Sequence, residues 1–342
     1  MNRNNSKVGE VMAISLRPAG IVGLGSYLPV ERITNADLVK IVDTTDEWIV
    51  SRTGIRERRK AAEHEAASDL GTKAAQKALL AAGITAEEVD LIIVATITPD
   101  SCMPSTACII QDNIGAKNAA AFDLTAACTG FVYALAVANQ FVAGGMYNTV
   151  LVVAPETLTK IVNWQDRNTC VIFGDGAGAA VIRPVAEGEG FLSFDLGAEG
   201  AGGDLLKVPA GGSRKPATHE TVEKNEHTMV MSGNEVFKFA VRIMGESSVR
   251  ALEKAGLSTE DIDFLVPHQA NTRIIDSAMK RLGLSKDKIY VNLQRYGNMS
   301  GASIPVALDE AVNEGLVKKG DLVVLVGFGG GLTWGAAVMR WV

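Results

Sequence analysis

Three polar residues in separate segments of the chain have types suited to attack on a carbonyl carbon. Cys128 lies in LTAACTGF, His268 in PHQAN and Asn298 in YGNMSGAS. A cysteine and a histidine together permit nucleophilic acyl transfer. An asparagine beside a histidine, with no carboxylate partner evident, supplies two neutral donors that can stabilise an oxyanion or an enolate. A papain-like hydrolase would need another group to orient the histidine, and the local signatures of that class are absent.

The surroundings of Cys128 predict a strand, a tight turn and a helix that begins near Thr129. At such a helix start, unpaired N–H groups and the helix dipole favour an anion. We therefore expect the pKa of the Cys128 thiol to lie below its usual value of about 8.5. The alternative is a buried cysteine that packs as a small hydrophobic residue. That is our interpretation of Cys102, Cys108 and Cys170, which lack this setting.

The other two residues have alternative interpretations when each is taken alone. His268 follows FLVP at a predicted strand end, where α/β proteins place ligand-facing residues, although a satisfied core histidine is the alternative. Asn298 equally suits a turn. The run from Phe328 to Gly331 can bring backbone N–H groups close to the sulfur because glycine allows close approach, or it can be a packing hairpin. The case for chemistry rests on Cys128, His268 and Asn298 together.

Two passages of the chain occur twice. Residues 78–91 read ALLAAGITAEEVDL and residues 251–264 read ALEKAGLSTEDIDF, while FGDGAGAAVIR at 173–183 matches FGGGLTWGAAVMR at 328–340. Agreement at both ends indicates one duplicated unit. We predict a flexible N-terminal tail over residues 1–17, a first half over 18–184 that carries the cysteine, and a second half over 185–342. The active site would then lie between two related halves.

The elements that position these residues follow an α/β pattern. Short apolar runs typical of buried strands alternate with amphipathic helical stretches such as 67–83 and 234–256, which predicts sheets sandwiched between helices. Segment 197–230 is rich in glycine and charge, and we expect a loop there. The predicted strands are AGIVGLG, LIIVATIT, AAAFDLT, TVLVVAPE, FLSFDLG, DFLVPHQ, IYVNLQR and LVVLVGFG.

Composition excludes several classes of protein. The chain has 342 residues and a net charge of −6, so it has no overall electrostatic signature for nucleic acid. Its four cysteines show no disulfide spacing and no CxxC pair, which favours a reducing, cytoplasmic setting and no metal site. The longest apolar run, around 119–138, is interrupted by Asp123, so we predict no membrane span. The tail lacks the apolar core of a signal peptide.

The chain resembles the β-ketoacyl-[acyl-carrier-protein] synthase III family from about Ile21 to its C-terminus. The motifs that carry the resemblance are, in order, GSYLP, TNADL, DEWIVSRTGIRER, AACTGF, FGDGAGAA, GNEVFK, VPHQAN, YGN and GFGGGLTWG. The resemblance implies a thiolase-like fold, in which the two halves form a five-layered α-β-α-β-α sandwich.

The resemblance also implies roles for individual residues. Cys128 would accept the acyl group, the N–H groups of Cys128 and Gly330 would form the oxyanion hole, and His268 with Asn298 would promote decarboxylation of malonyl and stabilise the carbanion. Residues implied to contact coenzyme A or substrate are Trp48, Arg52, Arg167, Asn234, Phe237 and Met103. Residues expected at a carrier-protein contact are Gln269, Ala270, Asn271, Thr272, Arg273, Lys238 and Lys280.

The implied activity is condensation of an acyl-CoA primer with malonyl-[acyl-carrier protein], giving 3-oxoacyl-[acyl-carrier protein], CoA and CO2. The expected partners are a second copy of the chain, acyl carrier protein and coenzyme A thioesters, with no bound cofactor. Thiolases use a second cysteine near the C-terminus, and elongating condensing enzymes use two histidines; neither feature occurs here. The alternatives are a related enzyme of secondary metabolism and a catalytically silent interaction protein.

Overall fold

The computed structural model describes residues 16–342, so all but the last two residues of the predicted tail lie outside the described part of the chain. The first sheet has the strand order β1-β7-β6-β4-β5. The second has the order β11-β12-β13-β8. The strands of the first are Ala19–Tyr27, Asp175–Pro184, Val150–Thr157, Leu91–Ala95 and Ala120–Leu124. Those of the second are Phe264–Pro267, Leu322–Gly329, Thr333–Arg340 and Gly190–Ala198. The division that we predict at 184/185 falls between β7 and β8.

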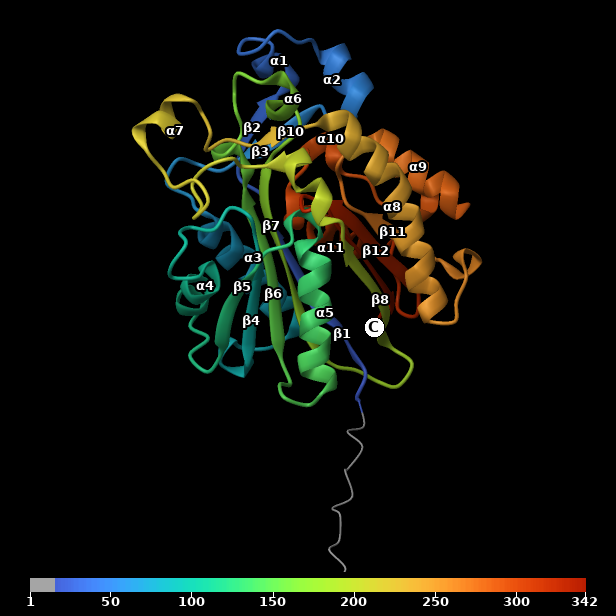
Figure 1. Cartoon of the computed structure of the whole chain (residues 1–342). Coiled ribbons are helices and arrows are strands. Elements are labelled where there is room, and N and C mark those ends of the chain that lie inside the picture. The colour runs from blue at the N-terminus through green and yellow to red at the C-terminus, as the bar shows by residue number, and fades with distance from the viewer. Residues whose placement is uncertain (1–15) are drawn as a thin grey trace, which may run out of the picture.

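Helices cover both sheets and also separate them (Figure 1). Helices α3 (Ala67–Ala82) and α4 (Thr106–Ile114) lie on the outer face of the first sheet, and α8 (Gly233–Lys254) and α9 (Thr272–Leu282) on that of the second. Helices α5 (Gly130–Ala143) and α11 (Ser303–Asn313) contact strands of both sheets and form the middle layer. The predicted five-layered sandwich is therefore confirmed.

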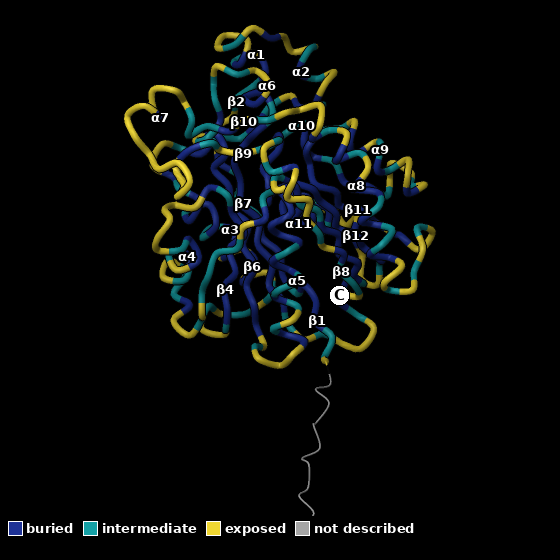
Figure 2. Tube along the Cα trace, viewed as in Figure 1, coloured by how far each residue is buried: buried dark blue, intermediate teal, exposed yellow. Residues whose placement is uncertain are grey.

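Alternate side chains of the central strands pack into different layers. In β6, Val150 and Val152 belong to the core between the sheets, whereas Leu151 and Val153 pack under α3. In β12, Val323 and Leu325 face the middle layer, whereas the alternate residues Leu322, Val324 and Val326 pack under α8. Strands covered on both faces need continuous apolar runs, as these sequences have. Figure 2 shows these elements as the buried interior of the molecule.

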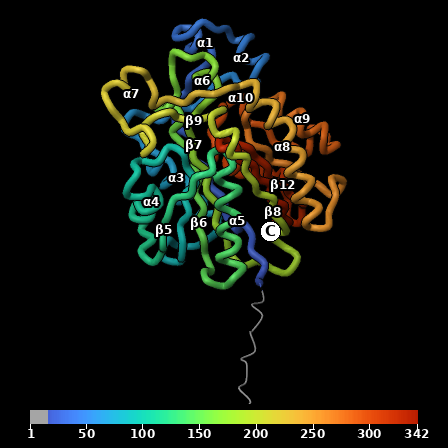
Figure 3. The backbone as a smooth tube through the Cα atoms, viewed as in Figure 1, coloured from blue at the N-terminus to red at the C-terminus, as the bar shows by residue number. Residues whose placement is uncertain are grey.

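Smaller elements gather at one end of the sandwich (Figures 1 and 3). They include α1 (Asn35–Leu38), α2 (Asp46–Thr53), α6 (Arg167–Cys170), α10 (Leu293–Tyr296) and the hairpin of β2 (Glu31–Thr34) and β3 (Glu57–Lys60). Segment 197–230 contains β9 (Leu206–Lys207), α7 (His219–Glu223) and β10 (Val230–Met231). Its outer part around α7 is exposed, but buried Met229 anchors its end against Leu158 and Phe173.

One predicted strand is wrong. The sequence IYVNLQR forms only an isolated bridge between Leu265 and Ile289 before α10 begins. The reason is a side chain: the amide oxygen of buried Gln269 accepts hydrogen bonds from the backbone N–H groups of Asn292 (3.0 Å) and Leu293 (3.3 Å). These N–H groups are satisfied without a neighbouring strand. The second sheet therefore has four strands.

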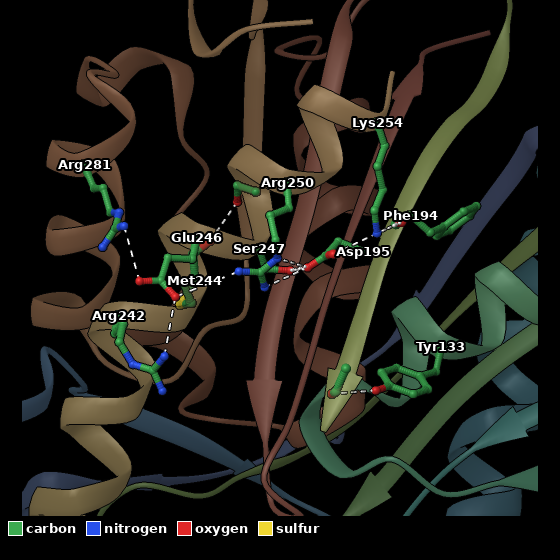
Figure 4. A network of polar contacts seen from close by, with 12 residues as sticks. Tyr133, Phe194, Asp195, Arg242, Met244, Glu246, Ser247, Arg250, Lys254 and Arg281 are labelled. Carbon is green, nitrogen blue, oxygen red and sulfur yellow. Dashed lines mark hydrogen bonds and ion pairs between the residues drawn. The ribbon is translucent and has the colours of Figure 1, made fainter. Parts of the chain in front are cut away.

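A polar network fixes α8 on the second sheet (Figure 4). Asp195 of β8 accepts hydrogen bonds from Ser247, Arg250 and Lys254 of α8, each at 2.9 Å. On the same helix, Glu246 pairs with Arg281 of α9 at 3.4 Å. The network therefore holds the long helix whose first turns carry Asn234 and Phe237.

Candidate active site

The carboxyl ends of parallel strands from both sheets meet at the proposed site. Cys128 follows β5, in the 3-10 turn η2 (Ala127–Thr129) that leads into α5. His268 follows β11, which runs parallel to β12. Asn298 precedes the 3-10 turn η7 (Ser300–Ala302) and α11, and its backbone bridges to Phe173. Ligand sites of open α/β sheets form at this edge, and each central helix begins there.

A cavity of about 280 Å³ brings the three residues together. Cys128, His268 and Asn298 are buried and line it, while Trp48 and Arg52 line it nearer the surface. The cavity therefore connects solvent with the three polar groups. Asn234 and Phe237 of α8 also line it.

The Cys128 thiol differs from our expectation in its acidity. Burial raises the pKa of the Cys128 thiol to about 12, with a smaller contribution from the charge of Glu156. The predicted lowering by the helix start is wrong for the free protein, because removal of water from the thiolate outweighs it. Ala127, directly before the thiol, has a φ of +48°. Such a backbone is strained for a residue with a side chain, and it turns the chain sharply at the nucleophile.

Glycines let the end of β12 approach the nucleophile closely. A Cβ atom at Gly329 would lie 2.6 Å from the backbone nitrogen of Cys128. Thr333 ties the two segments together, since its hydroxyl donates to the carbonyl oxygens of Ala126 and Gly330, both at 3.2 Å. Among the described residues, no carbonyl accepts a hydrogen bond from the N–H of Cys128 or of Gly330. Both donors therefore remain available to an oxygen near the sulfur.

His268 is not a satisfied core histidine. Its ring is fully buried, and neither ring nitrogen has a hydrogen-bond partner among the described residues. Burial lowers the pKa of His268 to about 3, so the imidazole is neutral and one of its nitrogens carries a proton that it can donate. The ring of Phe328 contacts it edge-on, with centroids 5.6 Å apart. A buried donor without a partner is suited to an anion that forms during a reaction.

The amide of Asn298 is oriented by the chain around it. Its Oδ1 accepts a hydrogen bond from the N–H of Ser300 at 2.8 Å. Its backbone N–H donates to Ile172 at 2.9 Å, and its carbonyl accepts from Gly174 at 3.0 Å. With the oxygen used in this way, the NH2 group is the part of the amide left for a ligand. His268 and Asn298 thus offer two neutral donors in one cavity.

An aromatic ring with two arginines stands at the outer part of the cavity. The guanidinium carbons of Arg52 and Arg167 lie 4.6 and 5.0 Å from the centre of the Trp48 ring. Arg167 of α6 does not line the cavity but reaches Trp48 of α2 from another segment. Asn271 joins α2 to α9, because its amide donates to the carbonyl of Arg52 at 2.7 Å.

A second cavity, of about 320 Å³, also has Cys128 in its wall. Its lining is mainly apolar. The large apolar residues are Ile97, Leu158, Ile161, Phe173, Leu206 and Met229. The sulfur therefore lies where a polar route from the surface meets an apolar chamber. Met103 does not line this chamber and is 86% exposed in the single chain.

The residues predicted at a carrier-protein contact fall into two groups. Arg273, Lys238 and Lys280 are exposed on α8 and α9, and Asn271 and Thr272 lie at the start of α9. Gln269 and Ala270 are buried, and Gln269 uses its whole amide within the chain. Including these two residues in the contact was wrong. The QANTR motif contains two kinds of residue: buried ones that form hydrogen bonds within the fold, and exposed ones at the surface.

The other cysteines differ in part from our interpretation. Cys102 and Cys108 are exposed rather than buried, whereas Cys170 is buried as predicted.

Sequence reasoning missed two residues next to the nucleophile. Glu156 is fully buried at the end of β6, and Ser300, which has a φ of +48°, is buried beside Asn298. In the sequence, Glu156 lies in VVAPETL and resembles the ordinary end of a strand. It follows Cys128 by 28 residues, and this spacing does not indicate that the two side chains are close in space.

Within residues 16–342, no helix is long and apolar enough to cross a bilayer, and no cluster of potential metal ligands occurs.

Comparison with known proteins gives consistent matches. Residues 122–200 and 252–341 match family models described as 3-oxoacyl-[acyl-carrier-protein (ACP)] synthase III and its C-terminal part. The β-ketoacyl-[acyl-carrier-protein] synthase III of Clostridioides difficile is 63% identical over 323 residues, covering 94% of this chain and 98% of that protein.

Solved structures agree with these matches. The 3-oxoacyl-[acyl-carrier-protein] synthase III of Aquifex aeolicus is 47% identical with a TM-score of 0.88, covering 94% of this chain and all (100%) of that one. The priming β-ketosynthase of the R1128 polyketide pathway is 36% identical with a TM-score of 0.89, covering 97% and 99%.

Proposed function

The chain belongs to the 3-oxoacyl-[acyl-carrier-protein] synthase III family and catalyses the condensation that initiates fatty acid synthesis, and we propose that Cys128, His268 and Asn298 divide this reaction between them. An acyl-CoA primer first acylates Cys128, and CoA leaves. Malonyl-[acyl-carrier protein] then loses CO2, and its carbanion attacks the thioester to give 3-oxoacyl-[acyl-carrier protein]. Identities of about 60% to fatty acid enzymes favour this activity over polyketide priming, for which the identity is 36%.

In the acylation step, the sulfur of Cys128 attacks the thioester carbonyl. The negative charge that develops on the carbonyl oxygen is stabilised by the N–H groups of Cys128 and Gly330, which no carbonyl of the described chain occupies. Donors placed before the reaction cost no reorganisation in the transition state. The close approach of Gly329, the neighbour of Gly330, to the Cys128 backbone nitrogen supports this assignment.

In the decarboxylation step, His268 and Asn298 donate hydrogen bonds to the thioester oxygen of malonyl as the enolate forms. Both groups are neutral, both residues line the cavity that Cys128 lines, and neither the His268 ring nor the Asn298 NH2 group donates a hydrogen bond within the described residues. A neutral imidazole stabilises the enolate without protonating it, so the carbanion stays reactive. This meeting of a thiol and two neutral donors in one cavity is the observation that carries the proposal.

The outer cavity suits coenzyme A. We assign the adenine end to Trp48, flanked by Arg52 and Arg167, because an indole stacks on a base and guanidinium groups bind phosphates. Asn234 and Phe237 then line the path of the pantetheine arm toward Cys128. An alternative for Arg52, a surface ion pair, is weaker, since this residue forms no salt bridge within the described residues.

The apolar chamber behind the sulfur suits the acyl group of the primer. Its 320 Å³ is about ten times the volume of a water molecule in the liquid, so it has room for more than an acetyl group. Met103 is exposed in the single chain, and we propose that it completes this chamber in the partner subunit of a homodimer. A flexible methionine there would admit a longer or branched primer.

The carrier protein is proposed to bind over α8 and α9. Arg273, Lys238 and Lys280 are exposed there, and Arg273 stacks on Phe237 of the cavity wall with its guanidinium carbon 5.0 Å from the ring. A basic patch next to the cavity entrance suits an acidic carrier protein.

We further propose that the enzyme works as a cytoplasmic homodimer without a bound cofactor. Four free cysteines support a reducing compartment.

Mass spectrometry of the intact protein after exposure to acetyl-CoA tests the division of roles. Wild-type protein should gain one acetyl group on Cys128, and Cys128→Ala should gain none while retaining some malonyl decarboxylation. Asn298→Ala should still be acetylated but should lose most decarboxylation. Overall condensation by Cys128→Ala would refute the assignment, and loss of acylation alone in Asn298→Ala would contradict the role of the amide.

A further inference from the structure

A buried carboxyl group stands next to the active site, and the roles assigned above do not use it. Glu156 ends β6, and its Oε2 accepts hydrogen bonds from the hydroxyls of Thr98 at 2.6 Å and Thr96 at 3.2 Å. The N–H of Ile97 lies 3.3 Å from the same oxygen. No lysine or arginine of the described residues pairs with it. A fully buried acid without a cationic partner is costly to the fold, so it calls for a reason.

Ser300 lies between this carboxyl group and the nucleophile. Its hydroxyl is buried and has no hydrogen-bond partner among the described residues, and its proximity lowers the pKa of both the Cys128 thiol and the Glu156 carboxyl. Ser300 and Cys128 line the same apolar chamber. The neighbouring Gly301 confirms the proximity, because a Cβ there would lie 3.7 Å from Glu156 Oε1 and 3.5 Å from the Ala127 carbonyl.

From this arrangement we infer that Glu156 accepts the Cys128 proton during acylation, through the hydroxyl of Ser300. The inference rests on the proposed function, in which Cys128 is acylated. As the S–C bond to the primer forms, the thiol proton moves to the Ser300 oxygen, and the Ser300 proton moves to Glu156. When the bond between the primer carbonyl and the CoA sulfur breaks, Glu156 returns its proton to Ser300, and the Ser300 hydroxyl donates a proton to the leaving CoA thiolate in place of the acylated Cys128 sulfur. The products are acyl-Cys128, CoA thiol and ionised Glu156.

The acidities of the three buried groups favour Glu156 over His268 as acceptor. Burial raises the pKa of Glu156 to about 7, whereas burial lowers that of His268 to about 3. Glu156 is therefore the stronger base by about four pH units, and near neutral pH a large fraction of it is ionised. Cys128 is the titratable group that faces it; its other neighbours are the hydroxyls of Thr96, Thr98 and Ser300 and the Ile97 N–H.

This path also explains how a weakly acidic thiol can react. With its pKa raised to about 12, the Cys128 thiol is protonated at neutral pH, and free thiolate is scarce. A base that takes the proton while the sulfur attacks avoids the isolated thiolate, and positioned bases of this kind typically contribute a factor of 10² to 10⁴ in rate. His268 then stays neutral for the decarboxylation step.

The test measures the rate of Cys128 acetylation by acetyl-CoA, with rapid quenching and mass spectrometry, from pH 5.5 to 9. In the wild type, the rate should fall about tenfold per pH unit below pH 7, as Glu156 becomes protonated, and should be level above pH 8. Glu156→Gln and Ser300→Ala should each be about 100-fold slower at pH 7.5 and should lose the break near pH 7. A rate that rises steadily through pH 9 in the wild type would indicate thiolate attack and overturn the inference.

Asp175→Asn is the matched control. Asp175, on the adjacent strand β7, is also buried with a pKa raised by burial to about 6, but it bonds Ala61 and Thr159 away from both cavities. It should keep both the rate and the break. An equal loss in Asp175→Asn and Glu156→Gln, or an unchanged profile in Glu156→Gln, would overturn the inference. If Glu156→Gln does not fold, Ser300→Ala decides on the same criteria. Absence of acetylation on wild-type Cys128 would instead overturn the proposed function.

Discussion

The neutrality of His268 leads to a prediction about stability as well as about catalysis. The imidazole is fully buried, and burial lowers its pKa from 6.5 to about 3. In the unfolded chain the same group takes up a proton near pH 6.5. The difference between these values, at about 1.36 kcal/mol for each pH unit, corresponds to about 5 kcal/mol of stability at pH 7 that is lost at low pH.

The sign follows from proton uptake. Between pH 6.5 and about 3 the unfolded chain binds one more proton at His268 than the folded chain does, so acid favours unfolding in this range. Glu156 acts in the opposite sense, because its raised pKa makes the folded state the better proton acceptor between pH 4.5 and about 7. A total pH profile mixes such contributions, and a variant that removes only His268 is needed to separate them.

His268→Gln provides this variant, since glutamine is polar and of similar length but does not titrate. We expect the free energy of unfolding of the wild type to fall by about 2.3 kcal/mol more than that of His268→Gln between pH 6.5 and 4.5, since the unfolded histidine is half protonated at pH 6.5. Urea unfolding at one fixed protein concentration measures this difference. NMR of histidine labelled with carbon-13 checks it directly, because the chain has only four histidines and the variant identifies one signal.

In the NMR titration, the His268 signal should stay unchanged from pH 8 to 5. Two results would show that the ring becomes charged inside the site. One is an equal fall with pH in the free energy of unfolding of the wild type and of His268→Gln, and the other is a His268 signal that moves near pH 6.5. The argument for two neutral donors would then fail, because a charged imidazolium would protonate the carbanion rather than stabilise it.

Two further predictions concern the space around the sulfur. Gly329→Ala should slow Cys128 acylation about 100-fold, because the new Cβ would lie 2.6 Å from the Cys128 nitrogen and displace an oxyanion donor; Gly200→Ala, at a site with open space, should not. Met103→Phe should lower kcat/KM for isobutyryl-CoA about tenfold relative to acetyl-CoA, if the partner's Met103 closes the acyl chamber. An unchanged ratio in steady-state kinetics would contradict that assignment.

The fold was largely predictable because its strands and helices carry strong periodic patterns. Helix 67–83 begins and ends within one residue of α3, and Gly83 caps it in the left-handed conformation that such an end requires. The strand IYVNLQR was not distinguishable from a real one, because Gln269 satisfies its backbone from another part of the chain. An apolar run shows which residues are buried, but not which group pairs with their backbone.

The site was predictable in its composition but not in its electrostatics. The residue types indicated Cys128, His268 and Asn298, and predicted strand ends supported Cys128 and His268. The acidity of the thiol depends on how much water reaches it, and a local sequence does not report this. The predicted pKa of the Cys128 thiol included the effect of the helix start of α5. It omitted the burial of the thiol by Gly329 and the η7 turn. The same omission concealed Glu156, whose relevance depends on the position of Ser300 in the other half.

The duplicated architecture accounts for a site built almost wholly from neutral groups. Each half supplies a central helix, α5 or α11, that begins beside the cavity, and each also supplies a strand end that carries one reacting or donating side chain. Helix starts and free N–H groups offer partial positive charge in fixed positions without a protonated side chain. A protonated side chain would quench a carbanion, whereas these donors stabilise it and leave it reactive. The two related halves thus allow decarboxylation and carbon–carbon bond formation to occur next to the same sulfur.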